Sequence, residues 1–315
     1  MSTTRLRFLA PIPRLRGTEH AWKQQLHRIE DLGFHAVAIS EHYSHGWAMD
    51  ALTAMNFALA QTSRLHAVPL VLNNDLHHPG VLAKAIATAD VLSGGRASVG
   101  IGAGWLADDY RALGVELDSA PTRVDRLQEA LQVITAFFAG DSVTFQGRHY
   151  HLDGLESLPR PAQDLGPPIL VGGGGTKMLQ LAGRYADIVG LHPQLGPGGL
   201  DESAARDLLR TSLDKKIGIV AASSAQAGRS MPQIQFTCYD VNVNGIQVTP
   251  ARPSFTNYIE AHLQFFADSP AALRGDTSEC VDRLQRWHEE FGITYWNLGS
   301  DVDAVAPVVA RLSAS

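Results

Sequence analysis

The stretch Leu65–Gly102, LHAVPLVLNNDLHHPGVLAKAIATADVLSGGRASVGIG, contains one complete strand–helix–strand unit. Leu65–Leu72 is a short apolar run typical of a buried strand, and Ala97–Gly102 is a second one. Between them, Pro79–Leu92 has helical spacing and stops at two glycines. Strands separated by a helix of this length predict a parallel pair joined by a crossover helix.

The same rhythm continues in both directions along the chain. Further strands are predicted at Arg5–Ala10, His35–Ser40, Pro168–Val171, Asp187–Leu191, Gln233–Val241 and Thr294–Leu298. Further helices are predicted at Glu19–Leu32, Trp47–Thr62, Thr122–Phe138, Thr176–Arg184, Thr277–Phe291 and Ala304–Leu312. Eight strands that alternate with helices favour a closed (β/α)₈ TIM barrel over an open sheet.

The interruptions of this rhythm are short, and no change in composition marks a second domain. Val143–Phe145 and His149–Leu152 read as a small hairpin, while Gln194–Gly199 and Asn242–Pro253 read as insertions at loop positions. We therefore expect one barrel domain over residues 1–315.

Composition limits the class of protein. The chain has 315 residues, 45% hydrophobic and 18% charged, which is ordinary for a globular protein. A formal net charge of −6 and the lack of a basic run disfavour nucleic acid as a partner. Two cysteines without a CxxC motif, no long apolar stretch and no signal-like N-terminus predict a cytoplasmic protein that does not enter a membrane.

Polar and glycine residues follow most of the predicted strands. In a (β/α)₈ barrel the active site forms where the strands end, so these residues are expected to converge on one rim. They are Glu41-His42-Tyr43, Asn73-Asn74-Asp75, His77-His78, Gly102-Ala103-Gly104, Gly172-Gly173-Gly174-Gly175 and His192-Pro193. This convergence is the sequence's own argument for an active site.

The run of four glycines, Gly172–Gly175, lies between a strand and a helix that begins near Thr176. Glycines let the backbone approach a ligand closely, and a helix start presents free N–H groups to an anion. We favour a phosphate cradle here over a merely flexible turn. The run is neither a Walker loop nor a GxGxxG fingerprint, so neither ATP nor a nicotinamide dinucleotide is indicated. Lys177, just inside this helix, is either a phosphate contact or a solvated lysine.

The histidines and acidic residues leave several alternatives open. His42 is a candidate proton donor or substrate partner, with a structural role as the alternative. No metal is expected, because no set of three suitably spaced ligands stands out. His77 is interpreted as part of a helix start, and Asp90, Asp108 and Asp109 as solvated or capping residues. The glycines around Gly102 serve either a planar ring or tight packing.

Three stretches carry a family resemblance. LVLNNDLHHP (Leu70–Pro79), LAKAIATADVLSGGR (Leu82–Arg96) and VGIGAGWLADDY (Val99–Tyr110) resemble the luciferase-like monooxygenase superfamily. Together with ILVGGGG (Ile169–Gly175), LVLNND is most similar to its actinobacterial branch that uses the deazaflavin coenzyme F420.

The resemblance implies a (β/α)₈ barrel of the bacterial-luciferase type and a set of site residues. His42 would line the active site, and Asn73 would hold the ring edge or the substrate. A backbone bulge at Leu70-Val71 or its neighbour, often with a non-prolyl cis peptide, would back the ring, and Gly102, Ala103 and Gly104 would border the ring and the ribityl chain. Gly172 to Gly175 with Thr176 would hold the phosphate. This chain has Glu41 where aspartate is commoner and Pro69 where threonine is frequent.

The resemblance also implies a function: an F420-dependent oxidoreductase, with reduction the favoured direction, that transfers a hydride between the deazaflavin and an organic substrate. The alternatives are an FMN-dependent monooxygenase that uses dioxygen and a non-catalytic flavin-binding protein. The expected partners are a small-molecule or peptide substrate and a second copy of the chain, since relatives commonly pair through the helices Trp47–Thr62 and Pro79–Leu92.

Overall fold

The computed structural model describes residues 5–195, 201–248 and 253–313. The chain divides into two compact units, each of which is built from parallel strands and helices. The first unit comprises Met1–Ala38, Gly173–Arg184 and Ile188–Ser315, and the second comprises Ile39–Gly172 and Tyr185–Asp187.

The strands of the larger sheet of the first unit pair in parallel. β1 (Arg7–Pro11) lies between β2 (Ala36–Ile39) and β14 (Ile293–Asn297), and β10 (Gln233–Thr237) lies between β14 and β9 (Ile188–Leu191). These strands are almost fully buried, as parallel strands covered by helices must be.

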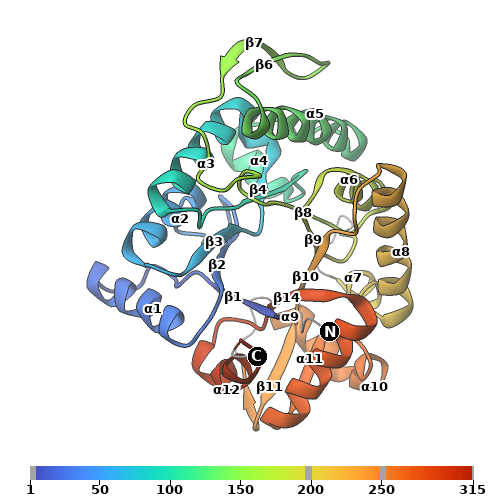
Figure 1. The fold of residues 1–315 in the computed structure, drawn as a ribbon. Coiled ribbons are helices and arrows are strands. Elements are labelled where there is room, and N and C mark those ends of the chain that lie inside the picture. Colours follow the sequence, from blue (N-terminus) through green and yellow to red (C-terminus); the bar gives the residue numbers. More distant parts are fainter. Residues whose placement is uncertain (1–4, 196–200, 249–252, 314–315) are drawn as a thin grey trace. The chain divides into compact units, whose positions relative to one another are not determined.

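Helices follow most of these strands, and α11 packs on α12 (Figure 1). The helices of the unit are α1 (Glu19–Asp31), α6 (Thr176–Tyr185), α7 (Glu202–Arg206), α8 (Arg210–Gln226), α9 (Pro253–Ala261), α10 (Leu263–Phe266), α11 (Thr277–Phe291) and α12 (Val302–Ser313). A small second sheet holds β11 (Asp240–Val243), β12 (Ile246–Gln247) and β13 (Ala272–Gly275).

In the second unit β5 (Val99–Gly102) lies between β4 (Leu72–Asn73) and β8 (Ile169–Gly173), again in parallel. The long helix α5 packs against α3, and the hairpin β6–β7 follows α5 (Figure 1). The other bounds are β3 (His66–Pro69), η1 (Asn74–Leu76), α2 (Ala51–Gln61), α3 (Pro79–Ser93), α4 (Ala107–Leu113), α5 (Ala120–Ala139), β6 (Ser142–Gln146) and β7 (His151–Glu156).

Local sequence signals explain where the helices begin and end. Asp50 caps α2 by accepting a hydrogen bond from the Thr53 amide, and Asp276 forms a capping box with Glu279 at the start of α11. Gly94 ends α3 in the left-handed conformation, as the sequence predicted for the glycine pair there.

Several predicted elements need correction. Leu65–Leu72 is not one strand but β3 and β4, separated by a cis peptide bond between Leu70 and Val71, where the resemblance had placed it. Gln233–Val241 is likewise two strands, because β10 ends at Thr237 and β11 pairs with β13 in the small sheet.

Two helix predictions also differ from the structure. The helix expected at Trp47–Thr62 begins only at Ala51, so Trp47 lies in the preceding loop. Helix α8 was missed, because its apolar residues do not form a clear stripe. Parts of both predicted insertions, residues 196–199 and 249–252, lie outside the described residues.

Candidate functional site

The first cluster of site residues belongs to the second unit and centres on His42. His42 follows β2, and its Nδ1 lies 2.7 Å from Oδ2 of Asp109 on the short helix α4. The other carboxylate oxygen of Asp109 accepts hydrogen bonds from the Ser44 hydroxyl at 2.5 Å and the Tyr43 amide at 3.0 Å. Both side chains of the pair are mostly buried, with 13% of His42 and 6% of Asp109 exposed.

The low pKa of Asp109 means that the hydrogen shared by this pair belongs to the His42 imidazole. Burial raises the pKa of Asp109, but the hydrogen bonds from Ser44, His42 and the Tyr43 amide outweigh it and hold that pKa below its usual value. A carboxylate can only accept, so His42 Nδ1 carries the hydrogen of the 2.7 Å bond. In the neutral ring, Nε2 is then the proton acceptor.

Two indole rings flank His42. The ring centroid of Trp47 lies 5.1 Å from that of His42, and the ring of Trp105 lies edge-on at 6.0 Å. Trp47 is 43% exposed and Tyr43 is 40% exposed, although both are large apolar side chains. Exposed aromatic faces beside a paired histidine suit a flat, partly apolar ligand.

Asn73 lies at the end of β4, as the sequence predicted, and its side-chain oxygen and backbone amide already have partners. Its Oδ1 accepts hydrogen bonds from the Asp75 amide and the Tyr110 hydroxyl, both at 3.1 Å, and its backbone amide donates to Oε2 of Glu41 at 2.7 Å. Its contact with a ring or a substrate stays a prediction.

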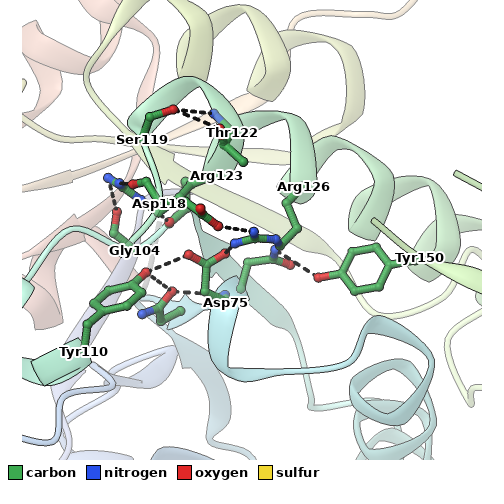
Figure 2. Close-up of polar contacts among 12 residues, drawn as sticks. Asp75, Gly104, Tyr110, Asp118, Ser119, Thr122, Arg123, Arg126 and Tyr150 are labelled. Atoms are coloured by element: carbon green, nitrogen blue, oxygen red, sulfur yellow. Dashed lines mark hydrogen bonds and ion pairs between the residues drawn. The ribbon is translucent and has the colours of Figure 1, made fainter. Parts of the chain in front are cut away.

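Sequence reasoning missed an ion-paired network around Asp75 (Figure 2). The network adjoins Asn73 through the Tyr110 hydroxyl. Arg126 on α5 donates to Asp75 at 2.7 Å and also to Asp118. The Tyr110 hydroxyl also lies 2.9 Å from Oδ2 of Asp75, so its single hydrogen is shared between Asp75 and Asn73, and burial keeps the pKa of this hydroxyl above the usual value. One turn before Arg126, Arg123 donates to the carbonyl oxygens of Ala103 and Gly104 at 3.2 and 3.3 Å. These bonds fix the backbone that the resemblance assigned to the ring.

Glu41 and His77 form a second histidine–carboxylate pair in the same unit. Oε1 and Oε2 of Glu41 lie 2.9 and 3.1 Å from Nε2 of His77, and only 2% of the Glu41 side chain is exposed. The cap of α3 is His78, whose side chain makes no capping hydrogen bond. The helix start predicted at His77-His78-Pro79 is confirmed with His78 as its cap, and His77 contributes through its pairing with Glu41 rather than through the cap.

Two of the three aspartates interpreted as solvated or capping residues, Asp90 and Asp109, are buried. Asp90 accepts hydrogen bonds from the amides of Ala162 and Gln163 and from the Gln163 side chain. Both carboxylates thus have partners more than sixty residues away in the sequence. Among the described residues, no group of three or more His, Cys, Asp or Glu side chains could hold a metal ion.

The glycines of the second unit are required mainly by packing. A Cβ on Gly100 would lie 1.6 Å from the Pro69 carbonyl oxygen, and a Cβ on Gly104, where φ is +75°, would lie 2.0 Å from the Tyr110 hydroxyl. A Cβ on Gly102 or Gly172 would meet the Val71 side chain at 2.9 or 3.0 Å. Leu70 is tied down by its amide, which donates to Ile39, and by its carbonyl, which accepts from Ser40.

The glycine loop at the start of α6 belongs to the first unit. A Cβ on Gly173 would meet Met178 at 2.9 Å, and one on Gly174 would meet the His192 carbonyl oxygen at 2.2 Å. Gly175 differs, because a Cβ there would meet only the Gln194 side chain at 3.9 Å. The carbonyl of Gly175 accepts the amide of Leu179, so Gly175 directly precedes the free amides of the helix start.

A cation that sequence reasoning missed lies beside this loop, and the role of Lys177 stays a prediction. Lys177 is exposed, as is Thr176. Lys216 on α8, which the sequence did not single out because it lay in a missed helix, is buried and donates to the Gly174 carbonyl at 2.7 Å. It also lies 2.7 Å from Oδ2 of Asp207.

Comparison with solved structures defines the class of fold. An F420-dependent secondary alcohol dehydrogenase, solved with an F420–acetone adduct, aligns with a TM-score of 0.73 at 20% identity over 98% of this chain and 97% of that one. The F420-dependent tetrahydromethanopterin reductase of Methanopyrus kandleri aligns with a TM-score of 0.70 at 18% identity over 97% of both chains. The fold is the (β/α)₈ barrel of the luciferase-like type, as the sequence predicted.

The chain belongs to the luciferase-like monooxygenase family, whose sequence model matches residues 17–239. An F420-dependent glucose-6-phosphate dehydrogenase of Microbacterium testaceum is 35% identical over 164 residues, which cover 50% of this chain and 48% of that one. A Nocardia farcinica protein with the same name is 30% identical over 65% of this chain and 59% of its own length. The matched region thus spans about half the length of the first of these relatives.

Proposed function

We propose that this protein is an F420-dependent oxidoreductase that transfers a hydride between the deazaflavin and a small organic substrate. The observation that carries the proposal is the His42–Asp109 pair, with its 2.7 Å hydrogen bond and its two flanking indoles. F420-dependent dehydrogenases among the curated relatives supply the choice of cofactor.

The chemistry assigned to His42 follows from its proton state. When bound, the deazaflavin supplies a carbon that accepts or gives a hydride. As the carbon of an alcohol loses that hydride, its hydroxyl proton passes to Nε2 of His42, and a carbonyl compound is left. Asp109 orients the ring and stabilises the imidazolium that forms. In the reducing direction the same nitrogen returns the proton.

Each unit by itself holds residues that suit one part of the cofactor. In the second unit Trp47 and Trp105 present aromatic surface, and Leu70, Val71 and Gly102 to Gly104 form the fixed backbone beside Asn73. In the first unit the amides at the start of α6, after Gly173 to Gly175, suit a phosphate. Gly172, Thr176 and Lys177 stay in the proposed set on their places in the sequence, and the resemblance supports only the first two.

A secondary hydroxyl, or the matching ketone, is the proposed reacting group. The relatives named glucose-6-phosphate dehydrogenases and the structural neighbour named a secondary alcohol dehydrogenase both point to it. An FMN-dependent monooxygenase is the second candidate, because an FMNH₂-dependent dimethylsulfone monooxygenase of Pseudomonas putida is 26% identical over half of this chain.

A binding titration followed by an anaerobic assay tests the proposal. We expect tight binding of F420, weaker binding of FMN, and turnover of secondary alcohols with F420 in the absence of oxygen. Tight FMN binding, no F420 binding and oxygen-dependent turnover would make the protein a flavin monooxygenase. Binding of either cofactor without turnover of any substrate would favour a flavin-binding protein.

Three further points remain part of the proposal. We propose a homodimer that pairs through α2 and α3, where Val81 and Leu92 are 69% and 83% exposed; a monomer mass in solution scattering would contradict it.

We propose a cytoplasmic location, consistent with two buried cysteines that are both free. The single domain over residues 1–315 stays a prediction. No described helix has the length and hydrophobicity needed to cross a membrane.

A further inference from the structure

Lys216 is a buried cation that the proposed chemistry does not use. It lies on α8, and only 5% of its side chain is exposed. Its ammonium group donates to the carbonyl oxygens of Gly174 at 2.7 Å and His192 at 3.2 Å, and it pairs with Asp207 at 2.7 Å. A lysine ammonium has three N–H donors, so these three partners satisfy it fully.

The three partners of Lys216 tie together two loops of the first unit. Gly174 follows β8 and His192 follows β9, and the His192 amide donates to the Gly173 carbonyl at 3.1 Å. Asp207 also accepts the amide of Gln194 at 2.7 Å. The loops lie so close that only glycine fits at position 174. Lys216 and Asp207 therefore fasten the glycine loop to its neighbour.

The charge of Lys216 affects the pKa of His192, which follows β9. Burial, with the Lys216 charge as a second cause, lowers the pKa of His192 to about 4. The imidazole of His192 is consequently neutral at pH 7. The positive charge beside these loops is that of Lys216, which pairs with the Asp207 carboxylate. Removal of the ammonium would leave the Asp207 carboxylate next to the glycine loop without its countercharge.

We propose that Lys216 is a positioning residue for the phosphate of the cofactor. By holding the Gly174 carbonyl, it orients the loop so that the amides at the start of α6 face an anion. By neutralising Asp207, it removes a negative charge that would repel that anion. This inference rests on the proposed function, and it moves the phosphate-linked cation from the exposed Lys177 to Lys216.

The test compares two ligands that differ only beyond the ribityl chain. One is F420, and the other is its deazaflavin chromophore without the phosphate and the glutamate tail. Fluorescence titration of the wild type is expected to show tighter binding of F420. Lys216→Met should weaken F420 binding about tenfold or more, equivalent to about 1.4 kcal/mol, and leave the chromophore's affinity unchanged.

Matched variants control for charge and folding. Lys215 is the preceding residue on the same helix and is exposed, so Lys215→Met should leave both affinities unchanged. Asp207→Asn keeps an oxygen for the Gln194 amide while it removes the negative charge, so it should not weaken F420 binding. If Lys216→Met does not fold, Lys216→Gln retains a donor for Gly174 without the charge, and it should lose part of the preference for F420.

The outcomes separate the two proposals. If the folded Lys216 variants bound both ligands more weakly by the same factor, Lys216 would be merely structural and the inference would be overturned. Equal affinity of the wild type for both ligands would also overturn it, while the proposed function would stand. Binding of neither ligand would overturn the proposed function, and FMN against riboflavin would then test Lys216 in the same way.

Discussion

Two of the histidine–carboxylate pairs in the second unit are mostly buried, and they are built from adjacent residues of one loop. His42 takes Asp109 as its partner, whereas Glu41 takes His77. In the first pair the carboxylate is occupied with holding the histidine and its loop, through Ser44 and the Tyr43 amide. In the second pair the histidine helps to hold a carboxylate, which in turn holds the amide of Asn73.

The difference shows that a histidine and a carboxylate can pair for two purposes, one to orient the histidine and the other to hold the carboxylate. The His42 ring is the end point of its network, with Nε2 left to act and exposed aromatic side chains around it. Glu41 is a junction, with hydrogen bonds that reach β4, His77 and the Tyr43 hydroxyl. We therefore expect changes in the first pair to affect turnover and changes in the second to affect stability.

The largest expected effect comes from His42→Ala. Loss of the proton acceptor should lower turnover about a hundredfold or more while cofactor affinity stays nearly intact. His45 is a matched control, because it lies three residues away and pairs with Asp108 at 2.9 Å but is about half exposed. Steady-state kinetics of His42→Ala and His45→Ala would check this, and wild-type turnover in the former would make His42 structural.

Asp109→Asn should come next, because the ring then loses its ionised partner. Turnover is expected to fall about tenfold to a hundredfold. The pKa of Asp109 is depressed in the folded protein, so its contribution to stability is complete above the unfolded-state pKa of about 4 and is lost as the pH falls through the folded value.

Urea denaturation at pH 7 and pH 3 measures this contribution. The wild type should be more stable than Asp109→Asn at pH 7, and the gap should narrow at pH 3. If the difference in unfolding free energy between the two proteins were the same at both pH values, the ionised carboxylate of Asp109 would not be what stabilises the fold.

Glu41→Gln and His77→Gln should produce the opposite pattern to His42→Ala. Each change leaves a largely buried polar partner with weaker hydrogen bonds, which typically costs about 1–3 kcal/mol of unfolding free energy. Turnover in the folded variants should change far less than in His42→Ala. If Glu41→Gln instead abolished turnover at unchanged stability, the division of work between the two pairs would be wrong.

Tyr43→Phe should have the smallest effect. The Tyr43 hydroxyl donates to Glu41 over 3.3 Å at an exposed site, so its loss should change the unfolding free energy by about 0.5 kcal/mol or less. Burial and the nearby Glu41 charge raise the pKa of Tyr43 to about 12, so the hydroxyl remains a donor at pH 9. Thermal melts at pH 7 and pH 9 should show the same small difference from the wild type.

The fold was largely predictable because its signals are local. Apolar runs of strand length, helical spacing and terminal glycines recur along the chain, and they place most of the strands and helices. The errors fall where a local signal misleads. The apolar character of Gln233–Val241 continues across the point where the chain changes sheets, and α8 has polar and small residues on all sides.

The site was only half predictable for a different reason. Polar residues that follow strands can be identified from the sequence, and His42 and Asn73 were identified in this way. Their partners could not be, because 67 residues separate His42 from Asp109 and 42 separate Gly174 from Lys216. A buried carboxylate or ammonium has the same local sequence pattern as an exposed one, and only the folded chain distinguishes them.

The contacts of Val71 have a consequence for how this protein can change over evolution. Its two γ-methyl groups face Gly102 on one side and Gly172 on the other, each within about 3 Å of where a Cβ would stand. An alanine at either glycine position would press on the valine, more severely at Gly102 than at Gly172, and a smaller residue 71 would relieve that contact. Substitutions at these three positions should be non-additive, so a lineage that first shortens residue 71 can replace either glycine at a lower cost.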